Sequence, residues 1–213
     1  MKIFYGIFYY FFKGFFRLFY HHKIFGREHI CKGPAIIASN HLSFWDPPIL
    51  GTSCPEEVYF IARATLFDHP ILRFFITRLN AYPVKGVAHD FTSFKLISQL
   101  LEEKKKVILF PEGRRSVDGK LQDFKTGVAM LAHRASCPII PAYIYGTFEI
   151  WSRARKFPKL WGHTACIFGS PLYMEAFSHL PKKEAHEAIT QKVRESVDNL
   201  RQWFENGAQG TPP

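Results

Sequence analysis

Residues 35–48 read AIIASNHLSFWDPP, and this stretch decides the fold. It opens with a short, mostly apolar run, Ala35–Ser39, which predicts a buried strand. Pro47 suits the first position of a helix and Asp46 suits the cap before it, so the residues from His41 to Asp46 are expected to form a loop. A strand, a polar loop and a helix in this order are the beginning of an α/β unit.

The same alternation continues along the chain. Short apolar runs predict strands at 58–62, 106–110, 139–145 and 164–168, with a further short strand ending in a cation at 82–86. Longer stretches with helical periodicity predict helices at 70–80, 90–104, 126–135 and 182–205. We therefore predict an α/β fold with a mostly parallel central sheet flanked by helices, preceded by an N-terminal aromatic membrane-interface helix.

Length and composition are those of one domain with its own core. The chain has 213 residues, of which 47% are hydrophobic and 22% charged. Lys and Arg total 28 against 18 Asp and Glu, and the net charge of +10 indicates an anionic partner such as nucleic acid, a membrane surface or a phosphorylated substrate. The 4 cysteines lie far apart and form no C-x-x-C pair, so neither a disulfide scaffold nor a zinc knuckle is expected.

The N-terminal segment is unusually aromatic. Residues 1–25 contain twelve Phe or Tyr, no acid and four cations, which are Lys2, Lys13, Arg17 and Lys23. The uninterrupted apolar run, 3–12, is ten residues long, whereas a helix that crosses the hydrocarbon needs about 20. Aromatic rings combined with cations on flexible stems suit the headgroup boundary of a bilayer. We predict a monotopic membrane anchor, and the alternative is a helix buried in the core.

A histidine and a carboxylate stand five residues apart in the loop after the first strand. Ligand sites commonly form at such strand ends, and a loop can fold His41 back onto Asp46, which a continuous helix could not do. A carboxylate on one ring nitrogen fixes the tautomer and stabilises the imidazolium, so the pair suits general-base catalysis. The structural alternatives are a plain helix cap for Asp46 and a satisfied polar residue at a strand end for His41.

A second candidate, FPEGRRS at 110–116, follows the strand at 106–110. Pro111, Glu112 and Gly113 predict a tight turn in which Gly113 can adopt a positive φ. Arg114 and Arg115 come next, where they could hold a phosphate through paired hydrogen bonds. The alternative is a surface turn with solvated arginines.

Four blocks in this order resemble the glycerolipid acyltransferases of the 1-acylglycerol-3-phosphate acyltransferase type. They are N-H-x4-D at 40–46, P-V-K at 83–85, F-P-E-G-x-R-S at 110–116 and I-I-P-A at 139–142, and F-K-x-G at 124–127 is a further match. The H-x4-D block alone is weak, but F-P-E-G-x-R about 70 residues later makes it a strong signal. The resemblance covers about residues 30 to 170. It implies an acyltransferase domain over 29–207, between the predicted anchor at 1–28 and a frayed tail at 208–213.

The resemblance implies transfer of a fatty acyl group from acyl-carrier protein or acyl-CoA to the 2-hydroxyl of 1-acylglycerol 3-phosphate, giving phosphatidic acid. No cofactor and no metal are expected. His41 would be the general base, and Asp46 would orient and polarise it. The residues that would bind the acceptor are Lys85, Glu112, Gly113 and Arg115, with Arg115 on the phosphate. The protein would be a peripheral or monotopic membrane protein facing the cytoplasm.

Two alternatives stay open at this point. The acceptor could be another lysophospholipid, or the protein could be a non-catalytic module that binds anionic lipid through basic patches. Such a patch would comprise Arg153, Arg155, Lys156 and Lys159, although docking of an acidic carrier protein or of the bilayer also explains it. A lipid-binding module has no need of a His–Asp pair, which favours the enzyme. Nucleic-acid binding is disfavoured because the aromatic residues do not interleave with the cations.

Overall fold

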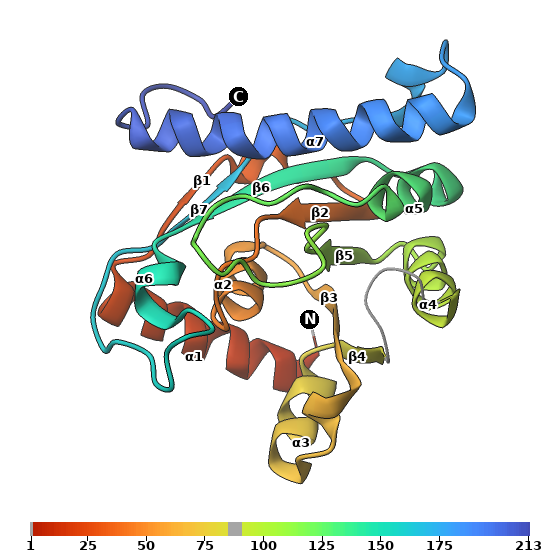
Figure 1. Ribbon diagram of the computed structural model, residues 1–213. Helices are drawn as coiled ribbons and strands as arrows, with labels where there is room; N and C mark the ends of the chain where they lie inside the picture. The colour runs from red at the N-terminus through yellow and green to blue at the C-terminus, as the bar shows by residue number, and fades with distance from the viewer. Residues whose placement is uncertain (1, 85–90) are drawn as a thin grey trace.

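A seven-stranded sheet forms the centre of the computed structural model, which describes residues 2–84 and 91–213 (Figure 1). The strands are β1 (Lys23–Phe25), β2 (Ala35–Ser39), β3 (Val58–Arg63), β4 (Ala81–Val84), β5 (Lys106–Leu109), β6 (Ile139–Tyr145) and β7 (Ala165–Phe168). Their order across the sheet is β1-β7-β6-β2-β5-β3-β4, and every neighbouring pair is parallel except β6 with β7. The predicted α/β fold with a mostly parallel sheet is confirmed.

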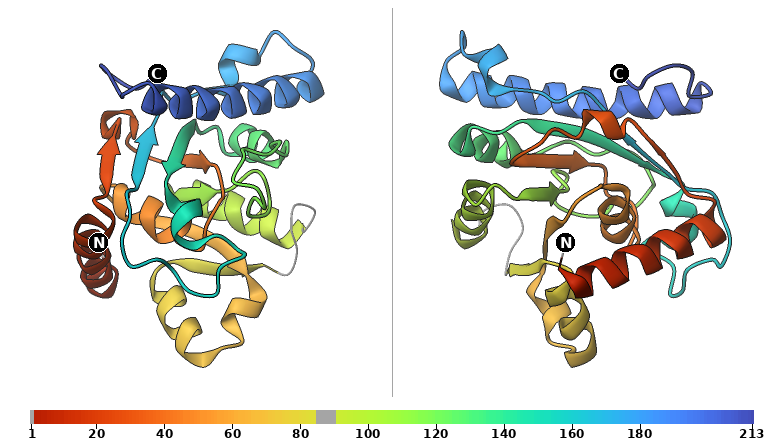
Figure 2. Two further views of the ribbon diagram at one scale, coloured as in Figure 1. Left: turned by 60° about the vertical axis from the view of Figure 1, so that its left-hand side comes forward. Right: turned by 180° about the vertical axis from the view of Figure 1, so that it is seen from behind.

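Helices cover both faces of this sheet. They are α1 (Ile3–Tyr20), α2 (Asp46–Ser53), α3 (Pro70–Arg78), α4 (Phe91–Glu102), α5 (Gly127–Ala135), α6 (Thr147–Trp151) and α7 (Lys182–Glu205), with short 3-10 turns at Arg27–His29, Ala64–Phe67 and Met174–Phe177. Ile36 and Ala38 of β2 pack with α4, α5 and α7, whereas Ala35 and Ile37 pack with α1 and α2. The alternation of side chains along one strand thus builds two cores, one on each face. In the views of Figure 2, α7 lies on one side of the molecule, and α1 and α3 lie on the other.

Most predicted elements are present. The strands predicted at 58–62, 106–110, 139–145 and 164–168 are β3, β5, β6 and β7, with ends that differ by at most one residue, and the four predicted helices are α3, α4, α5 and α7. The short strand predicted at 82–86 is β4, as far as the described residues reach. Strand β1 is too short to show a pattern in the sequence. Because it pairs with β7, part of the predicted 1–28 anchor belongs to the central sheet.

One face of α1 belongs to the core. Phe16 and Tyr20 are completely buried against the sheet and α2, and the hydroxyl of Tyr9 donates to the carbonyl of Cys54 at 2.9 Å. The opposite face is exposed and also apolar, and it comprises Ile3, Ile7, Tyr10, Phe11 and Leu18. The core-helix alternative therefore holds for one face of α1, and the membrane anchor stays a prediction for the exposed face. Within the described residues, no helix is both long enough and apolar enough to span a bilayer.

The C-terminal tail, predicted to be frayed, is held against the domain. The backbone N–H of Ser170 donates to the carbonyl of Pro213 at 3.2 Å. The indole N–H of Trp203 donates to the carbonyl of Gln209 at 2.9 Å. These hydrogen bonds fold residues 208–213 back onto the domain, so the structure differs from the prediction here.

Candidate active site

The candidate site lies at the carboxyl ends of β2 and β6. Asn40, which directly follows β2, joins the two strand ends. Its side-chain N–H donates to the carbonyl of Ile144 at 3.0 Å, and its Oδ1 accepts from the backbone N–H of Ile144 at 2.8 Å. This double hydrogen bond fixes the chain immediately before His41. Open α/β sheets commonly bind ligands at this edge.

The loop after β2 brings His41 onto Asp46. Nδ1 of His41 lies 2.8 Å from Oδ2 of Asp46. The carboxylate is completely buried, whereas the imidazole is 18% exposed. The hydrogen bonds of the described part of the chain leave Nε2 of His41 free, so this nitrogen is available to a substrate.

Four donors converge on the carboxylate of Asp46. Besides the ring of His41, Oδ2 accepts from the backbone N–H groups of Leu42 and Ser43, at 2.6 and 2.7 Å. Oδ1 accepts from the hydroxyl of Thr147 at 2.6 Å. A fully buried carboxylate needs such donors, because burying it without hydrogen bonds is strongly unfavourable. Oδ2 accepts two backbone N–H groups and therefore acts as a hydrogen-bond acceptor toward the imidazole as well. The ring nitrogen that faces it must donate, so we assign the ring proton of His41 to Nδ1.

Asp46 does not cap helix α2, contrary to the alternative considered from the sequence. It is the first residue of the helix, and Trp45 occupies the cap position. The backbone N–H of Ile49, which a cap would have satisfied, donates to the carbonyl of Trp45 at 3.0 Å. Because Pro47 and Pro48 have no N–H, nothing in the first turn competes for the carboxylate, and it turns back toward the loop.

The 110–116 motif holds His41 by its backbone. Oε1 of Glu112 accepts from the N–H of His41 at 2.9 Å, and the N–H of Ser116 donates to the carbonyl of His41 at 2.8 Å. The ring of Phe110 stacks on the imidazole, with centroids 4.0 Å apart and 16° between the planes. These contacts, all from one loop, fix the position of the histidine.

Glu112 is the most perturbed carboxyl group of the site. It is 4% exposed, and burial raises its pKa to about 7. The hydrogen bond from His41 lowers the pKa and the charge of Asp46 raises it, both by less than burial does. Oε2 is buried without a hydrogen-bond partner among the described residues. Glu112 therefore connects the two motifs through Oε1 and keeps a second oxygen unpaired.

The turn that follows separates the two arginines. Gly113 has φ +73°, as the sequence predicts, and its N–H donates to the carbonyl of Phe110 at 2.9 Å. This N–H closes the turn and is not available to stabilise an oxyanion. Arg114 is exposed, whereas Arg115 is partly buried. Of the two, Arg115 is thus the one that lies in the site.

The guanidinium of Arg115 lies over an aromatic ring. Its Cζ is 3.6 Å from the ring centroid of Phe44, and Nη1 is buried without a hydrogen-bond partner in the described part of the chain. Burial lowers the pKa of Arg115, and the charge of Arg153 lowers it further. The charge of Asp46 acts in the opposite direction, and that of Arg63 lowers the pKa by a smaller amount. Cations that repel one another in this way form a strong site for an anion such as phosphate.

Sequence reasoning missed two residues of the site. Arg63 is the last residue of β3 and pairs with Val84. The signal in the sequence that could have identified it is a cation at the end of a predicted strand. Thr147 begins α6, and no pattern in the sequence connects it with Asp46, because only the packing of the strands brings them together. Lys85, the remaining predicted acceptor-binding residue, lies outside the described residues.

Comparisons with known proteins show which family the chain belongs to. The chain is 28% identical over 180 residues to the 1-acyl-sn-glycerol-3-phosphate acyltransferase of Bacillus subtilis, which covers 84% of this chain and 87% of that protein. It is 29% identical to the 1-acyl-sn-glycerol-3-phosphate acyltransferase LPAT1, chloroplastic, of Arabidopsis thaliana, over 84% of this chain and 50% of that protein. The crystal structure of the 1-acyl-sn-glycerophosphate (LPA) acyltransferase PlsC from Thermotoga maritima matches with a TM-score of 0.76 at 27% identity, over 92% of this chain and 79% of that one.

The fold and the strand-end site are those of an α/β enzyme. The model of the Acyltransferase family matches residues 21–145, more than half of the chain and including both motifs, so this chain belongs to the Acyltransferase family. It is an O-acyltransferase by this membership and by its relatives. The chain spans most of the Bacillus relative but about half of the plant one.

Proposed function

We propose that this enzyme transfers a fatty acyl group from a thioester, carried by acyl-carrier protein or coenzyme A, to the 2-hydroxyl of 1-acylglycerol 3-phosphate. The product is phosphatidic acid. The observation that carries the proposal is the 2.8 Å contact of His41 with the buried Asp46, next to the cationic site at Arg115. The reaction needs both parts, a base for the hydroxyl and a cation for the phosphate. The names of the relatives support this choice of acceptor.

His41 acts as the general base. Its Nε2 takes the proton of the acceptor hydroxyl while the oxygen forms a bond to the thioester carbonyl carbon. Asp46 stabilises the imidazolium that results, because its carboxylate accepts the Nδ1 proton at 2.8 Å. When the tetrahedral intermediate collapses, the carbon–sulfur bond breaks and the imidazolium gives its proton to the thiolate. The acyl group moves directly to the acceptor, so no residue of the enzyme becomes acylated.

Arg115 binds the phosphate of the acceptor, and Arg63 and Arg153 strengthen the positive potential around it. The ring of Phe44 supports the guanidinium from below at 3.6 Å, so the planar group is presented with little freedom. A guanidinium whose Nη1 has no hydrogen-bond partner among the described residues has a donor left for a ligand. Lys85, where the resemblance has a further cation, would act on the same phosphate.

The exposed face of α1 lies in the interface of a membrane, on the cytoplasmic leaflet where both acyl donors are found. That face is apolar along the helix, and Arg17 is the cation of its last turn. The lysolipid acceptor is dissolved in the same layer. Contact with the bilayer therefore raises the concentration of acceptor at the site.

The test is a direct assay of the purified full chain. Labelled 1-acylglycerol 3-phosphate in vesicles is supplied with acyl-CoA or with acyl-carrier protein, and labelled phosphatidic acid is measured. The His41→Ala protein serves as the control. Product that forms with the wild type and not with the variant supports the proposal, whereas equal rates from both proteins contradict it. Replacing the acceptor by other lysophospholipids tests whether the phosphate group is preferred.

A further inference from the structure

The segment between α6 and β7 combines charge with exposed apolar side chains. Residues 153–163, here the α6–β7 loop, carry four cations and no acid. The same segment contains three large apolar residues whose exposed fractions are 71, 71 and 60%, namely Phe157, Leu160 and Trp161. The cations are Arg153, Arg155, Lys156 and Lys159. A solvated surface loop would not ordinarily expose three such side chains within five positions.

The backbone of this loop is fixed to α1. The hydroxyl of Tyr20 donates to the carbonyl of Lys159 at 2.9 Å, and the N–H of Gly162 donates to the carbonyl of Phe19 at 3.2 Å. The ring of Trp161 packs on that of Phe19, with centroids 4.9 Å apart. The apolar side chains are therefore displayed by a loop whose backbone is braced against the C-terminal end of α1.

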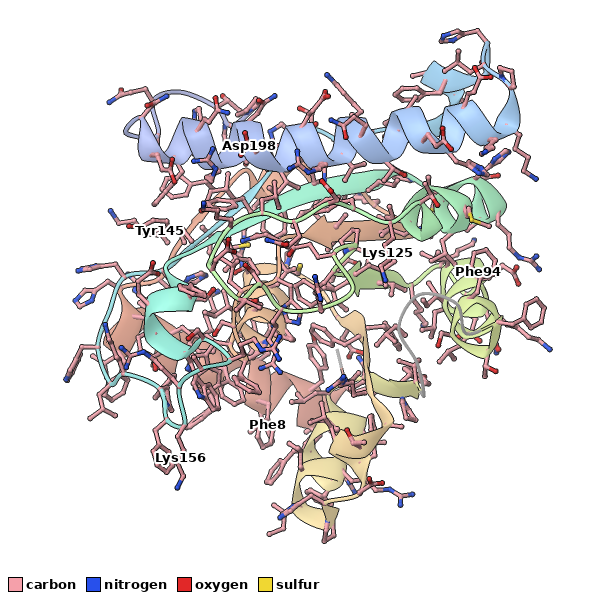
Figure 3. The ribbon with its side chains drawn as sticks, in the orientation of Figure 1. Phe8, Phe94, Lys125, Tyr145, Lys156 and Asp198 are labelled. Atoms are coloured by element: carbon pink, nitrogen blue, oxygen red, sulfur yellow. The ribbon has the colours of Figure 1, made fainter. Side chains whose placement is uncertain are left out.

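The loop lies on the same side of the molecule as α1 and α3. In Figures 1 and 2 these three segments lie in the lower half of the molecule, and α7 lies at the top. Lys156 points away from the body of the protein on this lower side, and Asp198 belongs to α7 on the upper side (Figure 3). Helix α7 carries five acids and five bases, so this helix has no excess of positive charge comparable to that of the loop.

The loop also begins at the catalytic motif. Ser152, the residue before it, forms an isolated antiparallel bridge with Ser43, and the N–H of Phe44 donates to the carbonyl of Trp151 at 3.3 Å. Ser43 and Phe44 both lie between His41 and Asp46 in the sequence. Whatever the loop binds is therefore brought close to the site.

We propose that the α6–β7 loop is a second membrane-contact element, in which Phe157, Leu160 and Trp161 insert among the headgroups of an anionic bilayer while Arg155, Lys156 and Lys159 bind lipid phosphates. This rests on the proposed function, in which the acceptor is a membrane lysolipid. Cations beside large exposed apolar side chains are typical of interfacial segments. An acidic carrier protein would account for the cations but not for the three exposed apolar side chains next to them. Contact at α1 and at the loop together orients the site toward the bilayer.

Vesicle sedimentation of the full chain tests the apolar part. Phe157→Ala/Leu160→Ala should raise the lipid concentration for half-maximal binding about tenfold, because both side chains lose apolar area that the bilayer would bury. The matched control, Met130→Ala/Tyr173→Ala, removes two exposed apolar side chains outside the loop and should bind like the wild type. Equal binding by the loop variant and the wild type would overturn the proposal.

Charge reversal tests the cationic part. On phosphatidylcholine vesicles containing phosphatidic acid, Arg155→Glu/Lys156→Glu should weaken binding more than about tenfold. Lys182→Glu/Lys183→Glu, with the same charge change on α7, should have a much smaller effect. If the loop reversal instead leaves vesicle binding intact and lowers only the rate with acyl-carrier protein as donor, the loop is a carrier-docking surface and the membrane proposal is wrong.

Fluorescence quenching reports directly on insertion. Lipids brominated in their acyl chains should quench Trp161, and the quenching should fall in Trp161→Phe, which retains a ring against Phe19. Unchanged quenching in that variant contradicts insertion.

The assay on a short-chain, monomeric lysolipid separates this test from the proposed function. Loop variants that retain this activity but lose vesicle binding support the second contact. If the loop variants also lose activity on the monomeric lysolipid, the loop belongs to the substrate site and the proposal of a separate membrane contact is wrong.

Discussion

The hydroxyl of Thr147 donates a 2.6 Å hydrogen bond to Oδ1 of Asp46, and both side chains are completely buried. The two residues are 101 positions apart in the sequence. Thr147 is the first residue of α6, so the bond ties the loop after β2 to the segment after β6. Because the other oxygen of the same carboxylate faces His41, Thr147 is a positioning residue for the proposed base.

Thr147→Val should lower kcat about tenfold and leave KM for the lysolipid nearly unchanged. The substitution keeps the shape of the side chain but leaves Oδ1 of Asp46 without a donor, and a hydrogen bond to a charged group is worth roughly 1.5–3 kcal/mol. Thr147→Ser should retain most of the rate. Steady-state kinetics and thermal melting of the three proteins check this. Thr52→Val, which removes a buried hydroxyl bonded within its own helix, is the control, and an equal loss there would indicate general destabilisation.

His41→Ala should lose nearly all transfer activity while lysolipid binding stays largely intact, because general-base assistance is typically worth 10²–10⁴-fold. Asp46→Asn should reduce the rate more than the affinity, since the amide no longer stabilises the imidazolium. Single-turnover rates and equilibrium binding separate the two effects. Substantial activity in His41→Ala would refute the mechanism.

Arg115→Ala should raise KM for the phosphorylated acceptor more than it lowers kcat, because it removes a charge-assisted contact worth roughly 1.5–3 kcal/mol. The effect should shrink with an acceptor that lacks the phosphate. Arg115→Lys should rescue only in part, since an ammonium group cannot make two parallel hydrogen bonds. Arg114→Ala is the natural control, because Arg114 is exposed one position away. A larger loss from Arg114→Ala would mean that the predicted register of this motif is wrong.

The sequence predicted the fold where burial produces a clear pattern. The strand at Ala35–Ser39 has the predicted bounds because every one of its residues is buried, and α7 has its predicted ends because one face of a long helix packs on the sheet. Strand β1 could not be predicted, since three residues show no periodicity and only its pairing with β7 stabilises it.

The candidate site divides in the same way. His41, Asp46, Glu112 and Arg115 lie in local motifs and could be named from the sequence alone. The partners that hold them come from distant segments, as Thr147 does, and the sequence contains no trace of such contacts. The predicted cap role of Asp46 failed for a related reason. Its carboxylate accepts hydrogen bonds from the loop N–H groups of Leu42 and Ser43 and not from the helix. The directions of these two N–H groups are set by the fold, so the sequence alone does not reveal them.

Glu112 should make stability depend on pH near neutrality. Its pKa is about 7 in the folded protein, against 4.5 as its ordinary value, so between these two pH values the folded state binds more protons than the unfolded state. The free energy of unfolding must then fall as pH rises through this window, with the loss complete above about pH 7. Glu112→Gln keeps an acceptor for the N–H of His41 and removes the titration. Denaturant unfolding at pH 5, 6, 7 and 8 should show the wild type losing stability relative to the variant, and parallel curves would contradict this assignment.

The two faces of α1 should respond differently to substitution. Ile7→Ser/Phe11→Ser changes only the exposed face, so thermal stability should stay near that of the wild type while binding to vesicles weakens. Phe16→Ala empties a fully buried position and should destabilise the fold by about 3–5 kcal/mol.

Deleting residues 1–25 would remove both faces and one strand of the sheet together, and it is therefore expected to unfold the domain. High salt should detach the intact protein only partly, because salt screens Arg17 but not the apolar side chains beside it. Vesicle sedimentation tests the exposed face of α1, and melting curves measured on the same preparations test the buried face. If the Ile7/Phe11 variant binds vesicles as the wild type does, α1 is a core helix alone, and the contact with the membrane lies elsewhere.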